Sequence, residues 1–220
     1  MNLRARLGNI RNEHVSMLLR GLLWQLMHLR FEGILFKGRG ARIWIDRRVR
    51  IRGILKVGDF AKLDLRFCIS GTIGPNFSLG DFSVMRASGS PDFTCPQFDI
   101  GPNVSFGPYC NIGGGFGLAI AGDVIAGPYV SIHPEEHGLG VDRPIRGQSI
   151  HGTGIRVGRD CWLSAKATLL DGTNLADGTV LGAGAILVGS RTEPNSIYVG
   201  VPARLLRLRE ENSPERISTS

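Results

Sequence analysis

The feature that most constrains how this chain can fold is an aliphatic residue that returns at every sixth position. The regular run is Val157, Leu163, Leu169, Leu175, Leu181 and Leu187. Four positions after each of the first five comes a small or short residue: Cys161, Ala167, Thr173, Thr179 and Ala185. A helix with 3.6 residues per turn cannot keep residues six apart on one face, whereas a strand can if the chain turns a corner every six residues. The repeat therefore predicts a prism whose sides are six residues long and whose aliphatic side chains point inward.

Stacked coils of this kind pair their strands in parallel and bury one continuous column of aliphatic side chains. The same period returns upstream in four runs of shifted frame, over residues 45–69, 73–85, 100–112 and 120–132. We therefore expect an all-β fold, a parallel β-helix of hexapeptide coils, over residues 41–204.

Two segments interrupt the repeat, residues 86–99 and residues 133–154. The second is 22 residues long and contains several polar groups. A long loop inside a regular structure is more often functional than idle. We expect residues 133–154 to leave the prism as an extruded loop.

The N-terminal segment, residues 1–40, lacks the six-residue period and predicts a basic amphipathic helix. Its apolar positions are 15, 18, 19, 22, 23, 26, 27 and 29, and residues 1–52 contain twelve Lys and Arg against three acids. Two interpretations remain open: peripheral contact with a membrane surface, or packing on the chain's own β-helix or trimer. At the other end, residues 205–220 predict a short C-terminal helix or tail.

Several classes of protein are not expected from this sequence. No run of eighteen apolar residues is present, and the start lacks the apolar core and cleavage site of a secretory signal. The four Cys contain no C-x-x-C pair, so we interpret them as reduced packing residues. We expect a cytoplasmic protein, with the inner face of the membrane as an alternative location. The basic residues lack interleaved aromatics, so nucleic acid is not an expected partner.

Residues 157–189 and 195–207 resemble the hexapeptide-repeat acetyltransferases, in the group that contains maltose, galactoside and polysaccharide O-acetyltransferases. The resemblance rests on CWLSA at 161–165, GAG at 182–184 and VPAR at 201–204. It implies a left-handed β-helix, a homotrimer, acetyl-CoA as co-substrate with no metal, and a sugar or sugar-nucleotide acceptor. The implied reaction is acetyl transfer to a sugar hydroxyl in surface polysaccharide or glycolipid biosynthesis.

A hydroxyl that attacks a thioester must lose its proton, and a His with a pKa near neutrality suits that role. In the family the base commonly lies five residues beyond the last inward aliphatic before the loop. Counting from Ile132, this position is His137, and His133 is the alternative base. The family often reads Asp-His-Asn-His here, whereas this chain has Pro134-Glu-Glu-His137. This departure leaves the acceptor open. Glu136 is a candidate for binding the acceptor, and Glu135 or Glu136 is a candidate for orienting the imidazole.

The family motifs also imply residues that bind the co-substrate. Ala165 matches the position whose N–H faces the thioester, and Ala183 matches the position that meets the pantetheine arm. Arg204 and Arg207 match positions near the CoA phosphates, which guanidinium groups suit geometrically. Asn111 matches a polar position of the acceptor cleft.

Three other functions stay open. The same base and co-substrate would serve an N-acetyltransferase that acts on an aminosugar nucleotide. The γ-type carbonic anhydrases share the fold and hold zinc between subunits, for which His133, His137 and His151 would be the ligands. The third alternative is a non-catalytic β-helix that serves assembly alone.

Overall fold

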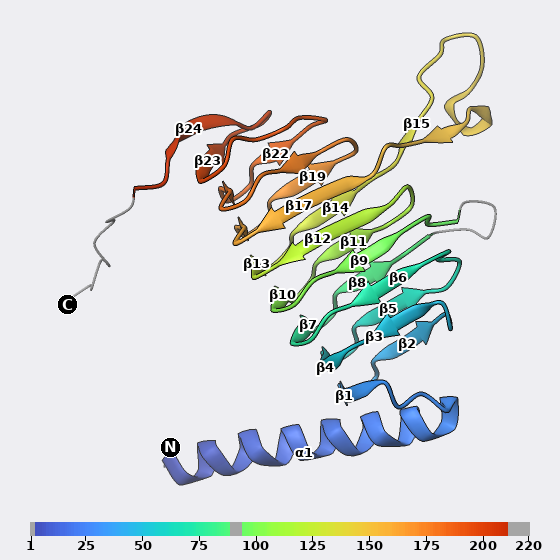
Figure 1. The fold of residues 1–220 in the computed structure, drawn as a ribbon, viewed down its shortest axis with the longest axis vertical. Coiled ribbons are helices and arrows are strands. Elements are labelled where there is room, and N and C mark those ends of the chain that lie inside the picture. The colour runs from blue at the N-terminus through green and yellow to red at the C-terminus, as the bar shows by residue number, and fades with distance from the viewer. Residues whose placement is uncertain (1–2, 89–93, 211–220) are drawn as a thin grey trace.

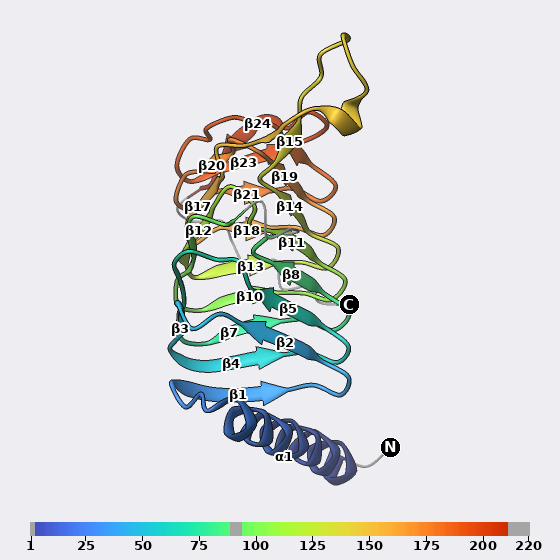
Figure 2. The same ribbon diagram turned by 90° about the vertical axis from the view of Figure 1, so that its right-hand side faces the viewer.

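The chain folds into a three-sided prism that stands on one long helix (Figure 1). The structure is a computed structural model that describes residues 3–88 and 94–210, and for residues 3–11 it describes the backbone only. Helix α1 spans Leu3–His28 and lies beneath the first coil. Figure 2 shows the strands stacked in successive layers above it.

Each side of the prism is one sheet, here called face A, face B and face C. Face A contains β1 Gly33–Lys37, β4 Gly53–Val57, β7 Phe77–Leu79, β10 Val104–Phe106, β13 Val124–Ala126, β18 Trp162–Leu163, β21 Val180–Leu181, β23 Ser196–Val199 and β24 Arg204–Leu208. Face B contains β2 Arg42–Ile45, β5 Lys62–Leu65, β8 Val84–Arg86, β11 Asn111–Gly113, β14 Ser131–His133, β19 Thr168–Leu170 and β22 Ile186–Leu187. Face C contains β3 Val49–Ile51, β6 Gly71–Ile73, β9 Phe98–Ile100, β12 Leu118–Gly122, β17 Ile155–Arg159 and β20 Asn174–Leu175.

Strands within each face are parallel, apart from the β23–β24 pair. The chain visits face A, then B, then C in each coil, so the turns form an A–B corner, a B–C corner and a C–A corner. The left-handed parallel β-helix expected from the sequence is confirmed.

The aliphatic column is where the repeat predicts it. All six residues of the run from Val157 to Leu187, and the five small residues that accompany them, are buried. The four Cys are buried and free, and burial raises the pKa of the Cys161 thiol to about 11. They are packing residues, as expected.

One upstream position is wrong in the expected frame. Ile69 is 51% exposed, and its neighbour Cys68 points inward instead. The backbone of Cys68 pairs with that of Cys95 in the next coil. Leu63 and Leu65 are both buried, and Phe67 turns the corner at a positive φ of 58°. This corner uses one residue fewer than the six-residue count assumes, which moves Cys68 inward.

Helix α1 is present, as expected, and no helix among the described residues is long and apolar enough to cross a membrane. The C-terminal segment differs from the expected helix, because Arg204–Leu208 forms strand β24 antiparallel to β23. The open edge of β23 offers unpaired backbone groups, which a following segment satisfies most directly as a strand. Residues 211–220, expected as a tail, lie outside the described residues.

The segment between β14 and β17 leaves the prism at the B–C corner and projects beyond it (Figures 1 and 2). It contains a two-stranded hairpin, β15 Glu136–His137 and β16 Ile150–His151, and a short 3-10 helix, η1 Ile145–Gly147. The Gln148 side chain crosses the loop, accepting from the Gly140 N–H at 2.8 Å and donating to the Gly140 and Arg143 carbonyls. The loop therefore has a defined shape of its own.

Candidate active site

The residues expected from the sequence fall into two groups along face B. Asn111, His133 and His137 belong to face B and the loop, whereas Ala165 and Ala183 lie at the A–B corner. Five residues separate Ala165 from Leu170, the β19 residue that pairs with His133. At about 3.3 Å per residue, His133 and Ala165 are about 16 Å apart along the face. A single chain does not bring them together.

His133 ends strand β14 and faces outward, because Ile132 beside it is fully buried and side chains alternate along a strand. Ser131 shares this outer surface, and its partner in the strand below is Asn111. Asn111 is exposed. The structure therefore places Asn111, Ser131 and His133 side by side on the outer surface of face B, which is a polar patch beside the base of the loop.

His137 lies four residues further on, in the first strand of the loop hairpin. Its partner across the hairpin is Ile150, and Glu136 is opposite His151. Glu136, His137 and His151 are exposed. Because successive side chains point to opposite sides of a strand, Glu136 and His137 face opposite sides of the hairpin.

Glu135 has a different environment. A Cβ on Gly115 would overlap its carboxylate, so the side chain lies directly over that glycine. The glycine run at residues 113–115 thus leaves room for the start of the loop to lie flat against the coil below. This contact lies where the loop leaves the prism, two residues before His137.

The A–B corner repeats one backbone geometry in successive coils, and equivalent positions are Pro108, Pro128, Ala165 and Ala183. The residue that follows each of these positions donates its N–H to the carbonyl oxygen of the equivalent position one coil below. Lys166 donates to the Pro128 carbonyl at 2.9 Å, and Gly184 donates to the Ala165 carbonyl at 2.9 Å. Proline has no N–H to offer. Among the hydrogen bonds of the described residues, the N–H groups of Ala165 and Ala183 have no acceptor.

Space at this corner also opens toward the top. Ala183 and Gly184 are exposed, and a Cβ built on Gly184 would meet no atom within 4 Å. Two free N–H groups one coil apart beside open space suit a thin, amide-bearing chain, because each N–H can donate to an acceptor on that chain. This arrangement fits the pantetheine arm of CoA.

The two arginines lie on strand β24, above this corner. Arg204 pairs with Val199, which lies against Gly182 of the coil below, so Arg204 stands near Ala183. Arg207 lies three residues further along the strand, opposite Ile197 and away from the corner, and forms an ion pair with Glu210 at 3.6 Å. The structure therefore brings Arg204, but not Arg207, to the edge that holds Ala183.

The motif CWLSA at 161–165 contains a further candidate site residue, Trp162, which the sequence analysis did not predict. Trp162 is 52% exposed on face A and lines a hollow of about 350 Å³ together with Ile125, Ile197 and Arg207. The six-residue repeat makes Leu163 inward and therefore places its neighbour Trp162 outward. A large aromatic residue at an outward position could have identified Trp162 as a candidate site residue from the sequence.

Among the described residues, no group of three or more His, Cys, Asp or Glu is placed to hold a metal ion. His133 faces outward from β14, while His137 and His151 lie on different strands of the hairpin.

Comparisons with known proteins connect these coils to acetyltransferases, although no protein-family model matches the chain. A putative acetyltransferase of Schizosaccharomyces pombe is 31% identical over 137 residues, covering 59% of this chain and 65% of that protein. A probable acetyltransferase of Mycobacterium tuberculosis is 37% identical over 67 residues, covering 30% of this chain and 22% of that protein. A putative lipopolysaccharide biosynthesis O-acetyltransferase of Escherichia coli is 26% identical over 113 residues, covering 48% of this chain and 57% of that protein.

The chain thus spans less than two thirds of the length of each of these curated relatives. Among solved structures, a maltose O-acetyltransferase from Clostridium difficile superimposes with a TM-score of 0.46 at 18% identity, covering 71% of this chain and 67% of that chain. The curated relatives, together with the hexapeptide coils, confirm that the chain resembles the hexapeptide-repeat acetyltransferases.

Proposed function

We propose that this chain is an acetyl-CoA-dependent acetyltransferase that acetylates a sugar hydroxyl during the synthesis of a surface polysaccharide or glycolipid. The observation that carries the proposal is the open A–B corner, where the N–H groups of Ala165 and Ala183 have no acceptor among the described residues. Both residues lie in motifs shared with acetyltransferases. The names of the curated relatives support the same reaction class.

The reaction takes place between two copies of the chain in a homotrimer. The candidate base and the candidate CoA-binding residues are separated by the width of face B, so each copy supplies one half of a site. The loop supports this arrangement, because Leu139, Val141 and Ile145 are large apolar side chains that stay exposed among the described residues. A neighbouring prism would cover them and bring its A–B corner to His137.

In the reaction, His137 accepts the proton of the acceptor hydroxyl as the oxygen attacks the thioester carbon. The carbonyl oxygen becomes an oxyanion, to which the free Ala165 N–H donates a hydrogen bond. The C–S bond then breaks, and the imidazolium returns its proton to the departing CoA sulfur. Arg204 binds a phosphate of CoA above the corner, and Arg207 extends this cationic strand.

The acceptor lies against Asn111, Ser131 and His133, because these outward side chains form the polar surface nearest to the loop. A sugar hydroxyl and an aminosugar amine would both use this surface and the same base. An aminosugar nucleotide is therefore the second acceptor class that the assay must include.

The test is a transfer assay with acetyl-CoA, in which sugars, nucleotide-sugars and aminosugar nucleotides are screened by mass spectrometry for gain of one acetyl group. His137→Ala should lower turnover by on the order of a hundredfold or more, while CoA binding and thermal stability stay unchanged. His133→Ala is the matched variant. If His133→Ala abolishes turnover and His137→Ala is nearly silent, the base is His133.

The oligomeric state is tested by light scattering on the same preparations. A homotrimer is expected. A stable monomer with full activity would remove the site between copies.

A further inference from the structure

Helix α1 has one face that holds it firmly to the prism. Met17 is 2% exposed, and a Cβ on Gly21 would overlap the Leu35 carbonyl, so helix and strand β1 touch at their backbones. The Gln25 amide donates to the Gly33 carbonyl at 2.7 Å. These contacts fix the rotation of the helix about its own axis.

The opposite face of α1 and the turn that follows it are apolar and bare. Seven large side chains there are 50–76% exposed: Val15, Leu19, Leu22, Leu23, Leu26, Met27 and Leu29. Their spacing of three and four residues places them on one side of the helix. In Figures 1 and 2 the helix lies below β1, so this side is directed away from the prism. Single exposed leucines need no explanation, but a continuous apolar surface of this size indicates a partner.

Exposed arginines surround this base along the first coil. Arg39 stands at the A–B corner, Arg42 on face B, Arg47 at the B–C corner, Arg50 on face C and Arg52 before the C–A corner. Arg39 pairs with Asp59. Within the described residues, the side chains of the other four arginines form no ion pair or hydrogen bond.

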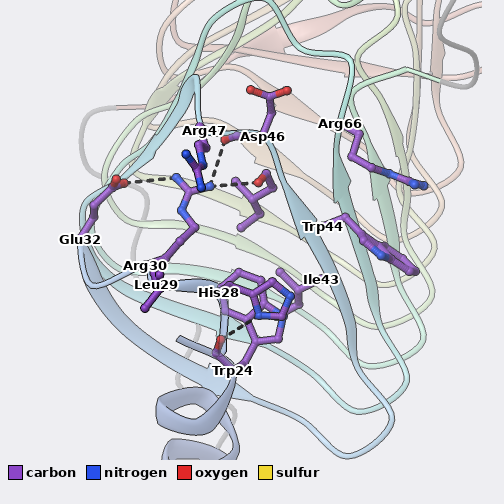
Figure 3. Close-up of a pocket in the computed structure, with 11 residues that line it drawn as sticks. Trp24, His28, Leu29, Arg30, Glu32, Ile43, Trp44, Asp46, Arg47 and Arg66 are labelled. Atoms are coloured by element: carbon purple, nitrogen blue, oxygen red, sulfur yellow. Dashed lines mark hydrogen bonds and ion pairs between the residues drawn. The ribbon is translucent and has the colours of Figure 1, made fainter. Parts of the chain in front are cut away.

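A hollow of about 630 Å³ adjoins the C-terminal end of the apolar face (Figure 3). Two indole rings line it: Trp24, on which His28 stacks at 4.2 Å, and Trp44. The cations of Lys62 and Arg66 lie 5.3 Å and 5.1 Å from the Trp44 ring. Indoles with neighbouring cations are typical of the boundary between lipid chains and headgroups.

The acids of this hollow are already paired. Arg48 bonds the Asp46 carboxylate and holds the pKa of that group at about 2, and Arg30 forms an ion pair with Glu32 at 3.4 Å. Arg47, which also lines the hollow, makes no such pair within the described residues. The net character of the hollow is therefore aromatic and cationic.

A second copy of the chain or a lipid bilayer could cover this apolar surface, and the charges around it decide between the two. A second copy placed base to base would bring two rims of arginine together, and like charges repel. A bilayer with anionic lipids complements both parts, the apolar face and the cationic rim. We propose that the base of the prism docks on an anionic lipid surface, with the bare face of α1 at the acyl boundary and the arginines and tryptophans among the headgroups.

Docking in this way would hold the prism upright. On face A, five strand steps separate β1 from β18, the first strand of that face after the loop. At about 4.8 Å per step, the candidate active site lies about 24 Å above the headgroups. This distance suits the sugar end of an acceptor more than its membrane-embedded part.

Flotation of the full chain with vesicles tests the proposal. The chain should float with phosphatidylcholine vesicles that contain phosphatidylglycerol, and float poorly with phosphatidylcholine alone or at high salt. Leu19→Gln combined with Leu26→Gln should weaken binding at least tenfold, because both side chains lose apolar contact with lipid. Ile69→Gln, at an exposed apolar residue on the B–C corner, should not change vesicle binding. Unchanged melting temperatures show that each variant is folded.

A charge-matched pair isolates the rim. Arg50 and Arg156 lie in the same outward column of face C, through the pairings Arg50–Thr72–Asp99–Ala119–Arg156. Arg50→Gln should weaken vesicle binding about fivefold, and Arg156→Gln should leave it unchanged.

Three results would each overturn the proposal: no flotation of the unmodified chain with anionic vesicles, equal losses in the two arginine variants, or flotation that survives the double leucine change. A lower assembly mass in the leucine variant, without an effect on flotation, would show that a second copy covers this face.

Discussion

Two corners of the prism have the same backbone conformation and very different side chains. At the C–A corner, Asn76, Asn103 and Asp123 have positive φ values of 61°, 56° and 53°. Their side chains bond one another in a polar ladder, from the Asn76 amide to Asn103 at 3.0 Å and from the Asn103 amide to Asp123 at 2.7 Å. Short polar side chains favour this left-handed conformation because they bond locally.

At the A–B corner, the same conformation is adopted by four aromatic residues, here called the aromatic ladder: Phe60, Phe82, Tyr109 and Tyr129. Successive rings stack with centroids 5.4, 5.2 and 5.1 Å apart. A bulky residue in this conformation costs about 1–2 kcal/mol, and stacking of aromatic pairs returns about 0.5–1.5 kcal/mol. The polar ladder is thus favoured locally, whereas the aromatic ladder depends on contacts between coils.

The aromatic ladder also ends where the candidate CoA site begins. The next two positions of its column are Lys166 and Gly184, with φ values of 61° and 68°. The lower part of this corner is therefore filled by rings, and the upper part is open. This contrast divides the corner into a lower part that the rings fill and an upper part at which we propose that CoA binds.

The first and largest expected effect tests the upper part of this corner. Ala183→Trp should block the path of the pantetheine arm and weaken CoA binding by on the order of a hundredfold or more, because the side chain fills open space beside the free N–H groups. The melting temperature without ligand should hardly change, since Ala183 is exposed. The measurement is the rise in melting temperature that CoA produces.

Val188→Trp is the matched control, an exposed residue of the same coil at the B–C corner. Its response to CoA should equal that of the unmodified chain. Normal CoA binding by Ala183→Trp would contradict the division of the A–B corner.

The second prediction places an aromatic side chain in the polar ladder. Asn103→Phe should lower the free energy of unfolding by about 2–3 kcal/mol, because it removes two side-chain hydrogen bonds and puts a bulky residue at positive φ without stacking partners. Urea unfolding measures this change. A loss below about 1 kcal/mol would mean that aromatic residues adopt this corner conformation without help from their neighbours.

The sequence predicts the coils well because their signal is local and repeated. A buried aliphatic at every sixth position decides which side chains point inward, as Val157, Leu163 and Leu169 do. The aromatic ladder is also visible once the frame is known, as the recurrent tripeptides Gly-Asp-Phe at 58–60 and 80–82 and Gly-Pro-Tyr at 107–109 and 127–129. Its stacking depends on coil lengths, which the interruptions of the repeat obscure.

Features that depend on distant partners could not be predicted in this way. Strand β24 forms because the edge of β23 is open, and nothing in Arg204–Leu208 itself excludes a helix. The separation of His137 from Ala183 depends on which corner the loop leaves, and this becomes known only when every strand has been assigned to a face. Motif spacing identified the candidate residues without their mutual positions.

The third prediction reverses the exchange between the two corners. Phe82→Asn removes two stacking contacts but relieves the strain of a bulky residue at positive φ. The free energy of unfolding should therefore fall by only about 1 kcal/mol, less than for Asn103→Phe, when both are measured by urea unfolding. A larger loss accompanied by a lower assembly mass would show that the aromatic ladder also contacts another copy.

The last and smallest effect concerns acid, to which the two corners should respond differently. Hydrogen bonds from Asn103 and Arg159 lower the pKa of Asp123 from its usual value. Folding therefore favours the ionised carboxylate, so this stabilisation is present above the unfolded pKa, about 3.9, and is lost as pH falls below it toward the folded pKa. Asp123→Asn should flatten the acid dependence of the free energy of unfolding in that range, and at neutral pH it should lower that free energy slightly, because the ionised carboxylate and its bond to Arg159 are lost. The matched change at the aromatic ladder, Tyr109→Phe, removes no group that titrates in acid, so its acid profile should keep the slope of the unmodified chain. Equal slopes for Asp123→Asn and the unmodified chain would show that the polar ladder is held by its backbone conformation alone.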